Sequence, residues 1–240
     1  MITTTAHSLS LPLSEAKEGG WIPYSQFKGP TASLDFMGCH VSVLSPGCCP
    51  HPPYAHIEEE LLIILEGEAE IQIAASPHDQ HPVKEVLRPG QFSYYPAWQH
   101  HTLKNVSSQP VTYLMFKWVA GSNAIATPHL KVGTHDCRAL LAEDDTRDFA
   151  PRRLFDASTE WLHRFHCHAT RLKPGGGYDA HIDAYDVAIV LLSGSIETIG
   201  QTIENKGVVY YSAGTLHGMR NPGQDIARYL VFEFETSPRP

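Results

Sequence analysis

The sequence predicts an all-β protein that contains two copies of one barrel or sandwich. From Trp21 onward, short runs rich in Val, Ile, Tyr and Phe alternate with Pro and Gly, which is typical of such folds. The segments 90–105 and 207–221 resemble each other: each begins with glycine, contains a Tyr-Tyr pair, and has a histidine four residues before an asparagine. Related residues flank both segments, and self-similarity over roughly a hundred residues indicates two domains rather than a short solenoid repeat.

Four parts of the chain follow from this repeat. Residues 1–20 are expected to form a loosely held N-terminal arm, 21–120 the first barrel, 121–160 the inter-domain connection, and 161–240 the second barrel. The connection has no counterpart inside either repeat and carries clustered charges. We therefore expect it to lie across one barrel.

Each copy is expected to contain a matching β-hairpin. The apolar run 61–65 predicts a buried strand that turns at Gly67 into the alternating strand 69–73. In the second copy, the run 187–192 and the strand 196–199 flank a Ser-Gly-Ser turn. Helical periodicity is scarce in both copies.

Composition and charge argue against several partners. The chain has 240 residues, a net charge of −8 and no basic run, so nucleic acid or an anionic membrane is not expected as the main partner. It lacks an apolar run of about eighteen residues, and its start lacks the pattern of a secretory signal. Five cysteines without CxxC spacing argue against a disulfide framework. We expect a cytoplasmic protein with no membrane partner.

The first copy contains a set of residues typical of a metal site, namely His51, His56, Glu60 and His101. Because side chains alternate along a strand, Glu60 is expected on the same face of the barrel as Leu62 and Ile64. A charged side chain facing an apolar interior is costly unless a metal or partner compensates it. Two or three imidazoles and one carboxylate suit Fe, Mn, Ni, Co or Zn, and leave positions open for substrate or water.

The second copy offers a related set, which consists of His181, Asp183, Asp186 and His217. Asp186 precedes Gly194 by eight residues, whereas Glu60 precedes Gly67 by seven. A β-bulge would absorb the extra residue, or Asp183 would be the ligand instead. A polar pocket without an ion is the third alternative. The sequence therefore predicts one or two divalent metal ions per chain.

These residues closely resemble the two sequence motifs of the cupin superfamily. His56-(x)3-Glu60-(x)6-Gly67 matches the second half of G(x)5HxH(x)3-4E(x)6G. The segment from Gly90 to Asn105 matches G(x)5PxG(x)2H(x)3N, except that Trp98 replaces a glycine. The first histidine of HxH falls at Tyr54, which leaves His51 as the nearest replacement.

In the second copy, the segment from Gly207 to Asn221 keeps the motif glycine but replaces its proline, and HxH reads His181-x-Asp183. The resemblance covers residues 35–119 and 162–235, as in two-domain bicupins. It implies two tandem double-stranded β-helix (jelly-roll) barrels. It also implies a three-His, one-Glu site in the first barrel and a two-His site with one or two aspartates in the second. Cupins include dioxygenases, decarboxylases, isomerases, hydrolases and sugar binders, so the resemblance does not select a reaction.

Four further side chains are candidates for substrate binding, namely Tyr94, Trp98, Tyr210 and Arg220. The three aromatic residues could line a pocket, although aromatic side chains at strand spacing also form cores. Arg220 could clamp a carboxylate or pair between strands. No residue other than the metal ligands is assigned a catalytic role.

The sequence favours a metal-dependent enzyme that acts on a small polar organic molecule, carboxylate or sugar-like, in the first barrel. A mixed His/carboxylate shell suits Fe(II) and favours dioxygenase-type oxidation. A non-catalytic bicupin that binds a small molecule or sugar, and a metal-assisted isomerase, lyase or hydrolase, remain alternatives. Sheet edges of such barrels often pair, so a homodimer also remains open.

Overall fold

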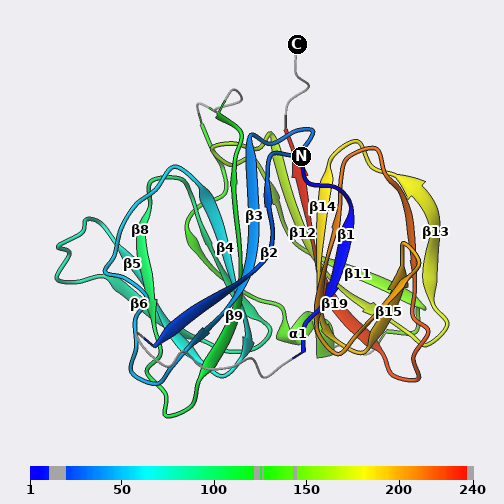
Figure 1. The fold of residues 1–240 in the computed structure, drawn as a ribbon, viewed down its shortest axis with the longest axis horizontal. Helices are drawn as coiled ribbons and strands as arrows, with labels where there is room; N and C mark the ends of the chain where they lie inside the picture. The colour runs from blue at the N-terminus through cyan, green and yellow to red at the C-terminus, as the bar shows by residue number, and fades with distance from the viewer. Residues whose placement is uncertain (11–19, 122–124, 126, 143–144, 237–240) are drawn as a thin grey trace.

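The computed structural model describes residues 1–10, 20–121, 125, 127–142 and 145–236. Two β-barrels lie side by side (Figure 1). The helix within the described ranges, α1 (Arg138–Ala142), is five residues long. No helix in these ranges is long and apolar enough to cross a membrane. The prediction of an all-β chain with two tandem jelly-roll barrels is confirmed.

The first barrel combines a six-stranded and a three-stranded sheet. The large sheet has the strand order β10 (Gly133–Asp136), β7 (Gln91–Tyr95), β4 (Glu59–Glu66), β9 (Val111–Val119), β3 (Phe36–Leu44) and β2 (Trp21–Gly29). The small sheet has the order β6 (Val83–Leu87), β5 (Ala69–Ala74) and β8 (His100–Lys104).

The second barrel repeats this plan with a six-stranded and a four-stranded sheet. The large sheet has the order β1 (Thr5–Ser8), β17 (Gly207–Tyr211), β14 (Asp186–Ser193), β19 (Ala227–Glu235), β12 (Arg164–Leu172) and β11 (Phe149–Ala157). The small sheet has the order β13 (Gly177–Ile182), β18 (Leu216–Arg220), β15 (Ser195–Thr198) and β16 (Gln201–Glu204).

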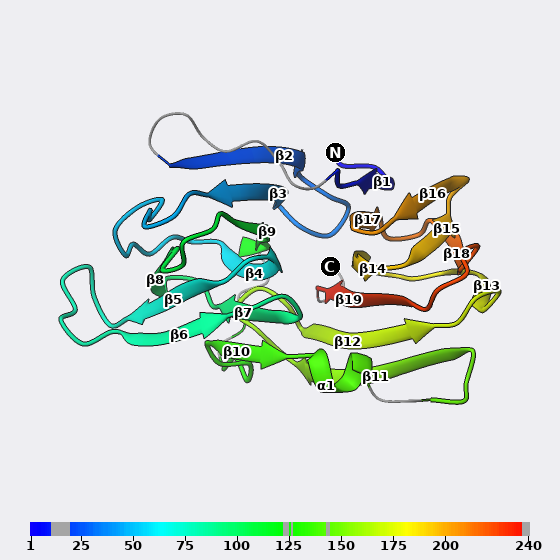
Figure 2. The ribbon, with the colours of Figure 1, turned by 90° about the horizontal axis from the view of Figure 1, so that it is seen from below.

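The two copies exchange their first strands. β1 precedes the strands of the first barrel but pairs with β17 of the second, from Thr5 opposite Tyr210 to Ser8 opposite Gly207. β10 precedes the second barrel but pairs with β7 of the first. Figure 2 shows each strand beside its partner at one edge of a large sheet. The expected arm is thus anchored at residues 5–8, whereas residues 11–19 lie outside the described part of the chain.

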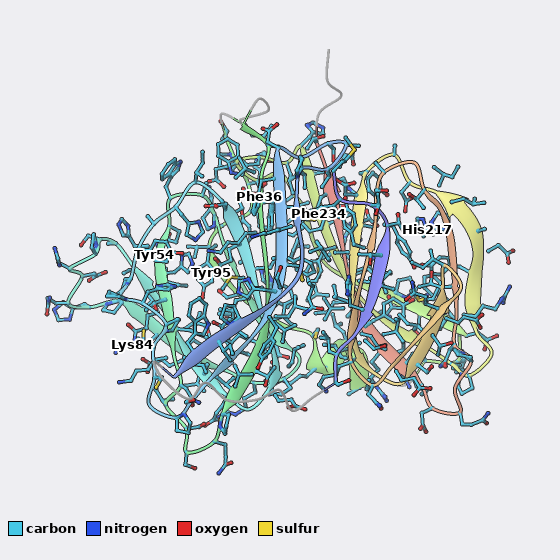
Figure 3. The ribbon with its side chains drawn as sticks, viewed as in Figure 1. Phe36, Tyr54, Lys84, Tyr95, His217 and Phe234 are labelled. Atoms are coloured by element: carbon cyan, nitrogen blue, oxygen red, sulfur yellow. The ribbon has the colours of Figure 1, made fainter. Side chains whose placement is uncertain are left out.

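The two large sheets pack against each other and enclose a shared apolar core. Aromatic rings dominate this core: the centroids of Trp118 and Phe234 are 5.2 Å apart, and those of Phe116 and Phe232 are 6.3 Å apart. Phe234 lies between the barrels in Figure 3. Two further apolar clusters fill the individual barrels.

β4 is buried on both faces, which explains why its sequence contains a continuous apolar run. Leu61 and Ile63 belong to the shared core, whereas Leu62 and Ile64 fill the first barrel. The strand ends before Gly67, whose φ is 75° and where an added Cβ would lie 2.6 Å from a backbone oxygen. The predicted strands β4 and β5, and β14 and β15, are present, but the expectation that each pair forms a hairpin is wrong. At Gly67 and at Gly194 the chain crosses from the large to the small sheet, so the two strands of each pair do not bond to each other.

A buried carboxylate in the first barrel binds the loop between β11 and β12 of the second barrel. Glu59 is fully buried at the start of β4. It accepts hydrogen bonds from Thr159 Oγ1 at 2.8 Å, from Trp118 Nε1 at 2.5 Å and from the backbone N–H of Glu160 at 2.7 Å. Because a buried carboxyl group is costly without hydrogen-bond partners, these bonds fix the loop at residues 159–162 against β4.

The second barrel repeats this contact in the opposite direction. Asp186, fully buried at the start of β14, accepts hydrogen bonds from Thr31 Oγ1 and Ser33 Oγ, both at 2.6 Å. Thr31 and Thr159 lie in matching turns, in which each hydroxyl also accepts a backbone N–H from three residues later. The two barrels are therefore joined by a reciprocal pair of carboxylate–threonine contacts.

Replacing Thr159 or Thr31 by valine is expected to lower the free energy of unfolding by about 2 kcal/mol, because a buried carboxylate loses a hydroxyl donor in each case. Denaturant unfolding measures this change. Thr202→Val, on the exposed strand β16, is a control of the same chemistry and should change the value by less than about 0.5 kcal/mol. Equal effects of Thr159→Val and Thr202→Val would contradict the role given to Glu59.

Candidate metal centres

Three side chains meet inside the first barrel with ligand atoms suited to a metal ion. His56 Nε2 lies 3.3 Å from Glu60 Oε2, and His101 Nε2 lies 3.4 Å from the same oxygen. The three ligand atoms all lie within 4.8 Å of one another. Glu60 belongs to β4, His101 to β8 of the small sheet, and His56 to the loop before β4. This group, the first-barrel centre, therefore joins the two sheets of the barrel.

Backbone carbonyls orient both imidazoles of the first-barrel centre. His56 Nδ1 lies 3.0 Å from the carbonyl oxygen of Glu58, and His101 Nδ1 lies 2.8 Å from that of Gln99. Since a carbonyl oxygen only accepts, each Nδ1 carries a proton and each Nε2 of the neutral ring keeps its lone pair. Tyr95 stacks on His101 with centroids 4.0 Å apart. Such outer contacts are typical of metal-binding histidines.

Glu60 is the member of the centre that most requires a cation. It is 1 % exposed, and within the described residues neither oxygen has a hydrogen-bond partner of good geometry. Burial opposes its ionisation, but His101, His56 and Lys117 outweigh this effect and hold the pKa of Glu60 well below its ordinary value. Metal bonds of about 2.1 Å separate neighbouring ligand atoms by roughly 3.0–3.4 Å. The residues of this centre therefore fit a divalent metal ion.

A lysine lies beside the first-barrel centre. Lys117 Nζ is 3.2 Å from Glu60 Oε2, and 3.3 Å from both His56 Nε2 and the Tyr54 hydroxyl. Burial disfavours its charge, but Glu60 and Tyr54 raise the pKa of Lys117 above its ordinary value. Sequence reasoning missed this residue. Lys117 pairs with Glu60 across β4 and β9, and this pairing can be recognised only when the register of the two strands is known.

The structure does not bring His51 into the first-barrel centre. Its Nδ1 lies 3.0 Å from the carbonyl oxygen of Pro52, and its ring packs edge-on against Tyr54 with centroids 4.3 Å apart. Tyr54 forms an isolated β-bridge with His101, with N···O distances of 3.2 and 3.3 Å. Tyr54 thus holds the place of the first motif histidine, and the expected three-His, one-Glu set contains two histidines.

The second barrel brings together His181, Asp183 and His217, which we name the second-barrel centre. His217 Nε2 and His181 Nε2 lie 3.4 and 3.6 Å from Asp183 Oδ2. His217 repeats the environment of its first-barrel counterpart, because its Nδ1 lies 2.9 Å from Thr215 O and Tyr211 stacks on it at 3.9 Å. Figure 3 shows His217 in the second barrel and Tyr54 in the first.

Strand register shows that the two centres take their carboxylate from different positions. His181 lies opposite His217 across β13 and β18, as in the bridge of the first barrel. Val187 pairs with Glu233 across β14 and β19, at the level where the first barrel has its glutamate. Corresponding residues of the two barrels are Tyr54 and His181, His56 and Asp183, Glu60 and Val187, and His101 and His217.

The structure does not bring Asp186 to the second-barrel centre. Its carboxylate binds the loop between β2 and β3 of the first barrel, on the other side of β14. Asp186 precedes Gly194 by eight residues, just as Glu59 precedes Gly67 by eight. The longer spacing is therefore no bulge, because Asp186 corresponds to Glu59, and Asp183 is the carboxylate beside the histidines.

A cavity of about 270 Å³ opens beside the second-barrel centre. Its walls include His181, Asp183 and His217, together with His168 and Glu233 of the large sheet. The cavity approaches the volume at which pockets hold small organic ligands.

Two of the four candidate substrate-binding residues face the shared core instead of a centre. The Tyr94 hydroxyl donates a hydrogen bond to Glu59 Oε1 at 3.0 Å, and Tyr210 is fully buried in the same core. Arg220 is exposed and pairs with Asp179 at 3.1 Å.

Trp98 is the candidate that lies next to a centre. Its backbone N–H donates to the carbonyl oxygen of His56 at 2.7 Å, and its side chain is 62 % exposed. The φ of Trp98 is 64°, in the left-handed region that the motif glycine would favour, and Gly214 takes the same conformation with φ of 81°. A role in substrate binding stays a prediction for all four candidates.

Comparison with known proteins supports the relationship that the motifs predict. Residues 40–117 match the sequence model of the cupin domain. No curated protein sequence matches the chain. A Pseudomonas aeruginosa protein described as glyoxylate-induced shares the fold at 14 % identity and a TM-score of 0.68, over 94 % of this chain and 85 % of that one.

Two similar structures are enzymes by name. A variant of oxalate decarboxylase from Bacillus subtilis aligns at 12 % identity and a TM-score of 0.66, over 100 % of this chain and 79 % of that one. A variant of salicylate 1,2-dioxygenase from Pseudoaminobacter salicylatoxidans aligns at 15 % identity and a TM-score of 0.62, over 86 % of this chain and 72 % of that one. The match of residues 40–117 to the cupin-domain model and the shared fold of both barrels support the relationship to the cupin superfamily.

Proposed function

We propose that the chain is a metal-dependent enzyme that acts on a small organic anion at the first-barrel centre. The observation that carries this proposal is the buried group of His56, His101 and Glu60. Two imidazoles and one carboxylate with open positions are typical of non-haem Fe(II) sites that use dioxygen. A dioxygenase-type oxidation is therefore favoured, and Mn, Ni, Co or Zn would also suit these ligands.

When bound, the ion would supply Lewis acidity or redox chemistry. The chain's own contribution is to hold the ligands ready. His56 and His101 keep their Nε2 lone pairs directed at the centre, because their Nδ1 atoms are bound to carbonyl oxygens. Glu60 supplies one negative charge, so a divalent centre keeps a net positive charge that attracts an anion.

Lys117 supports the choice of an anion as substrate. Its ammonium group contacts Glu60 and the Tyr54 hydroxyl at the wall of the centre. Once the charge of Glu60 is taken up by an ion, this ammonium group can pair with a substrate carboxylate. The two enzymes named above share this fold and act by name on oxalate and salicylate, which are both organic acids. The second barrel has Glu233 in place of this lysine, so the feature is specific to the first barrel.

A metal-assisted lyase or isomerase is the second candidate. Lys117 lies within 3.3 Å of a ligand imidazole and of the Tyr54 hydroxyl, where it could also move a proton. Oxygen uptake separates the two candidates, because dioxygenase turnover consumes O2 together with the organic acid, whereas a lyase or isomerase consumes none. Uptake matched to substrate loss in an oxygen electrode supports oxidation. Substrate loss without uptake would leave the lyase or isomerase.

Glu60→Gln and His101→Ala are each expected to remove the metal of the first barrel and abolish turnover, because each deletes one of three ligands. Elemental analysis of the purified variants measures the metal, and substrate loss measures turnover. Glu204→Gln and His81→Ala, at exposed positions, are the matched controls and should retain both. If the unaltered chain shows no turnover, and one of these two variants still binds the ligand, the chain would instead be a binding module.

Lys117→Met is expected to weaken binding of oxalate or salicylate to the metal-loaded protein by roughly 10-fold or more, because a charge-assisted hydrogen bond is lost. Lys117→Arg should retain most of the affinity. Calorimetric titration provides the measurement, and Lys104→Met on the exposed side of β8 is the control. Unchanged anion affinity in Lys117→Met would refute the anchoring role.

A further inference from the structure

A third group of potential ligands lies outside both centres. β12 carries the sequence His166-Cys167-His168, and Glu233 of the neighbouring β19 pairs with His166 in the strand register. His166 Nε2 lies 3.1 Å from His168 Nδ1, and one ligand atom of each residue lies within 4.8 Å of the others. We propose that His166, His168 and Glu233, here named the β12 centre, bind a divalent transition-metal ion such as Zn²⁺ or Cu²⁺.

Strand geometry places the three side chains on one face. Residues two apart in a strand point the same way, so His166 and His168 share a face of β12. The alternate residues Phe165 and Cys167 are buried in the shared core between the barrels. The β12 centre therefore faces the interior of the second barrel, and it rests on two neighbouring strands that are paired on both sides in a six-stranded sheet.

An outer carboxylate orients one of the imidazoles. Asp156 Oδ2 on β11 lies 3.2 Å from His166 Nδ1. A carboxylate acceptor fixes the proton on Nδ1 and leaves the Nε2 lone pair of His166 for a metal. Carboxylate–histidine–metal arrangements of this kind are typical of protein metal sites. Without a metal, the Nδ1–H of His168 can donate to this lone pair, and transfer of that proton to Nε2 of the same neutral ring would free Nδ1 as a ligand.

The charges around the β12 centre also suit a divalent cation. Arg164 pairs with Asp156 at 2.9 Å, with Glu233 Oε2 at 2.7 Å and with Glu235 at 3.6 Å. Three carboxylates around one guanidinium leave two formal negative charges. Arg164 thereby orients Asp156 and Glu233. Imidazole nitrogens with a carboxylate favour Zn, Cu, Ni or Co over Mg or Ca.

The first barrel shows that the β12 centre is not imposed by the fold. Gly38 pairs with Lys117 in the first barrel at the level where His166 pairs with Glu233 in the second. His168 has a counterpart in His40, but glycine and lysine replace the other two ligands, so the complete set belongs to the second barrel alone. His168 and Glu233 line the 270 Å³ cavity that also reaches the second-barrel centre. The two groups come from different sheets, so a ligand in this cavity would lie between two potential metal ions.

The test counts ions in the full chain after chelation and reloading with Zn²⁺. In the double variant Glu60→Gln, His217→Ala, which disables the two other centres, we expect one equivalent of Zn²⁺ per chain to remain. Adding His166→Ala or His168→Ala should remove that equivalent. Adding His163→Ala, at an exposed neighbouring position, should not. Retention of the ion in the His166→Ala and His168→Ala chains, or no binding in the double variant, would overturn the proposal.

A second variant tests the β12 centre without removing a ligand. Asp156→Asn is expected to weaken Zn²⁺ affinity in the same double variant by about 10–100-fold, the usual effect of losing a carboxylate behind a ligand histidine. Electron paramagnetic resonance of the Cu²⁺ form should show coupling to two imidazole nitrogens, and this signal should be lost after His168→Ala. Unchanged affinity in Asp156→Asn, or the same nitrogen coupling in His168→Ala, would count against the site. Because the first-barrel centre is disabled throughout, these outcomes are independent of the proposed enzymatic function.

Discussion

Two buried carboxylates, Glu59 and Asp186, hold the barrels in a fixed relation to each other. Each begins the central strand of one large sheet and accepts hydroxyl hydrogen bonds from a loop between two strands of the other barrel. Neighbouring residues of a strand point to opposite faces, so fixing Glu59 toward the interface directs Glu60 into the barrel. The contact that joins the barrels thereby also positions the carboxylate of the first-barrel centre.

Duplication supplied one scaffold, and side-chain changes gave its copies different chemistry. Both centres retain two histidines and one carboxylate, but the carboxylate is Glu60 on β4 in the first barrel and Asp183 in the loop before β14 in the second. Opposite these groups, the first barrel has Lys117 where the second has Glu233. The first barrel therefore presents a cation beside its centre and the second an anion, so the two sites favour different ligands.

Local pattern in the sequence was sufficient for the fold and for part of the first-barrel centre. Apolar runs, turn glycines and the repeat predicted two all-β barrels, and the cupin motifs identified His56, Glu60 and His101, which the structure brings together. The exchange of β1 and β10 was not predictable in this way, because the sequence of an edge strand does not indicate which strand it pairs with. Lys117 was missed for a related reason, since its contact with Glu60 depends on register between strands far apart in sequence.

The paired tyrosines show the same limit within a single strand. β7 is buried at every position, so burial does not distinguish the face of Tyr94 from that of Tyr95. The structure does: Tyr95 stacks on His101 in the first-barrel centre, whereas Tyr94 donates to Glu59 at the interface. One Tyr-Tyr pair therefore supports both the site and the contact between the barrels. A strand with two buried faces can serve two functions at once, and only its cross-strand partners show which residue serves which.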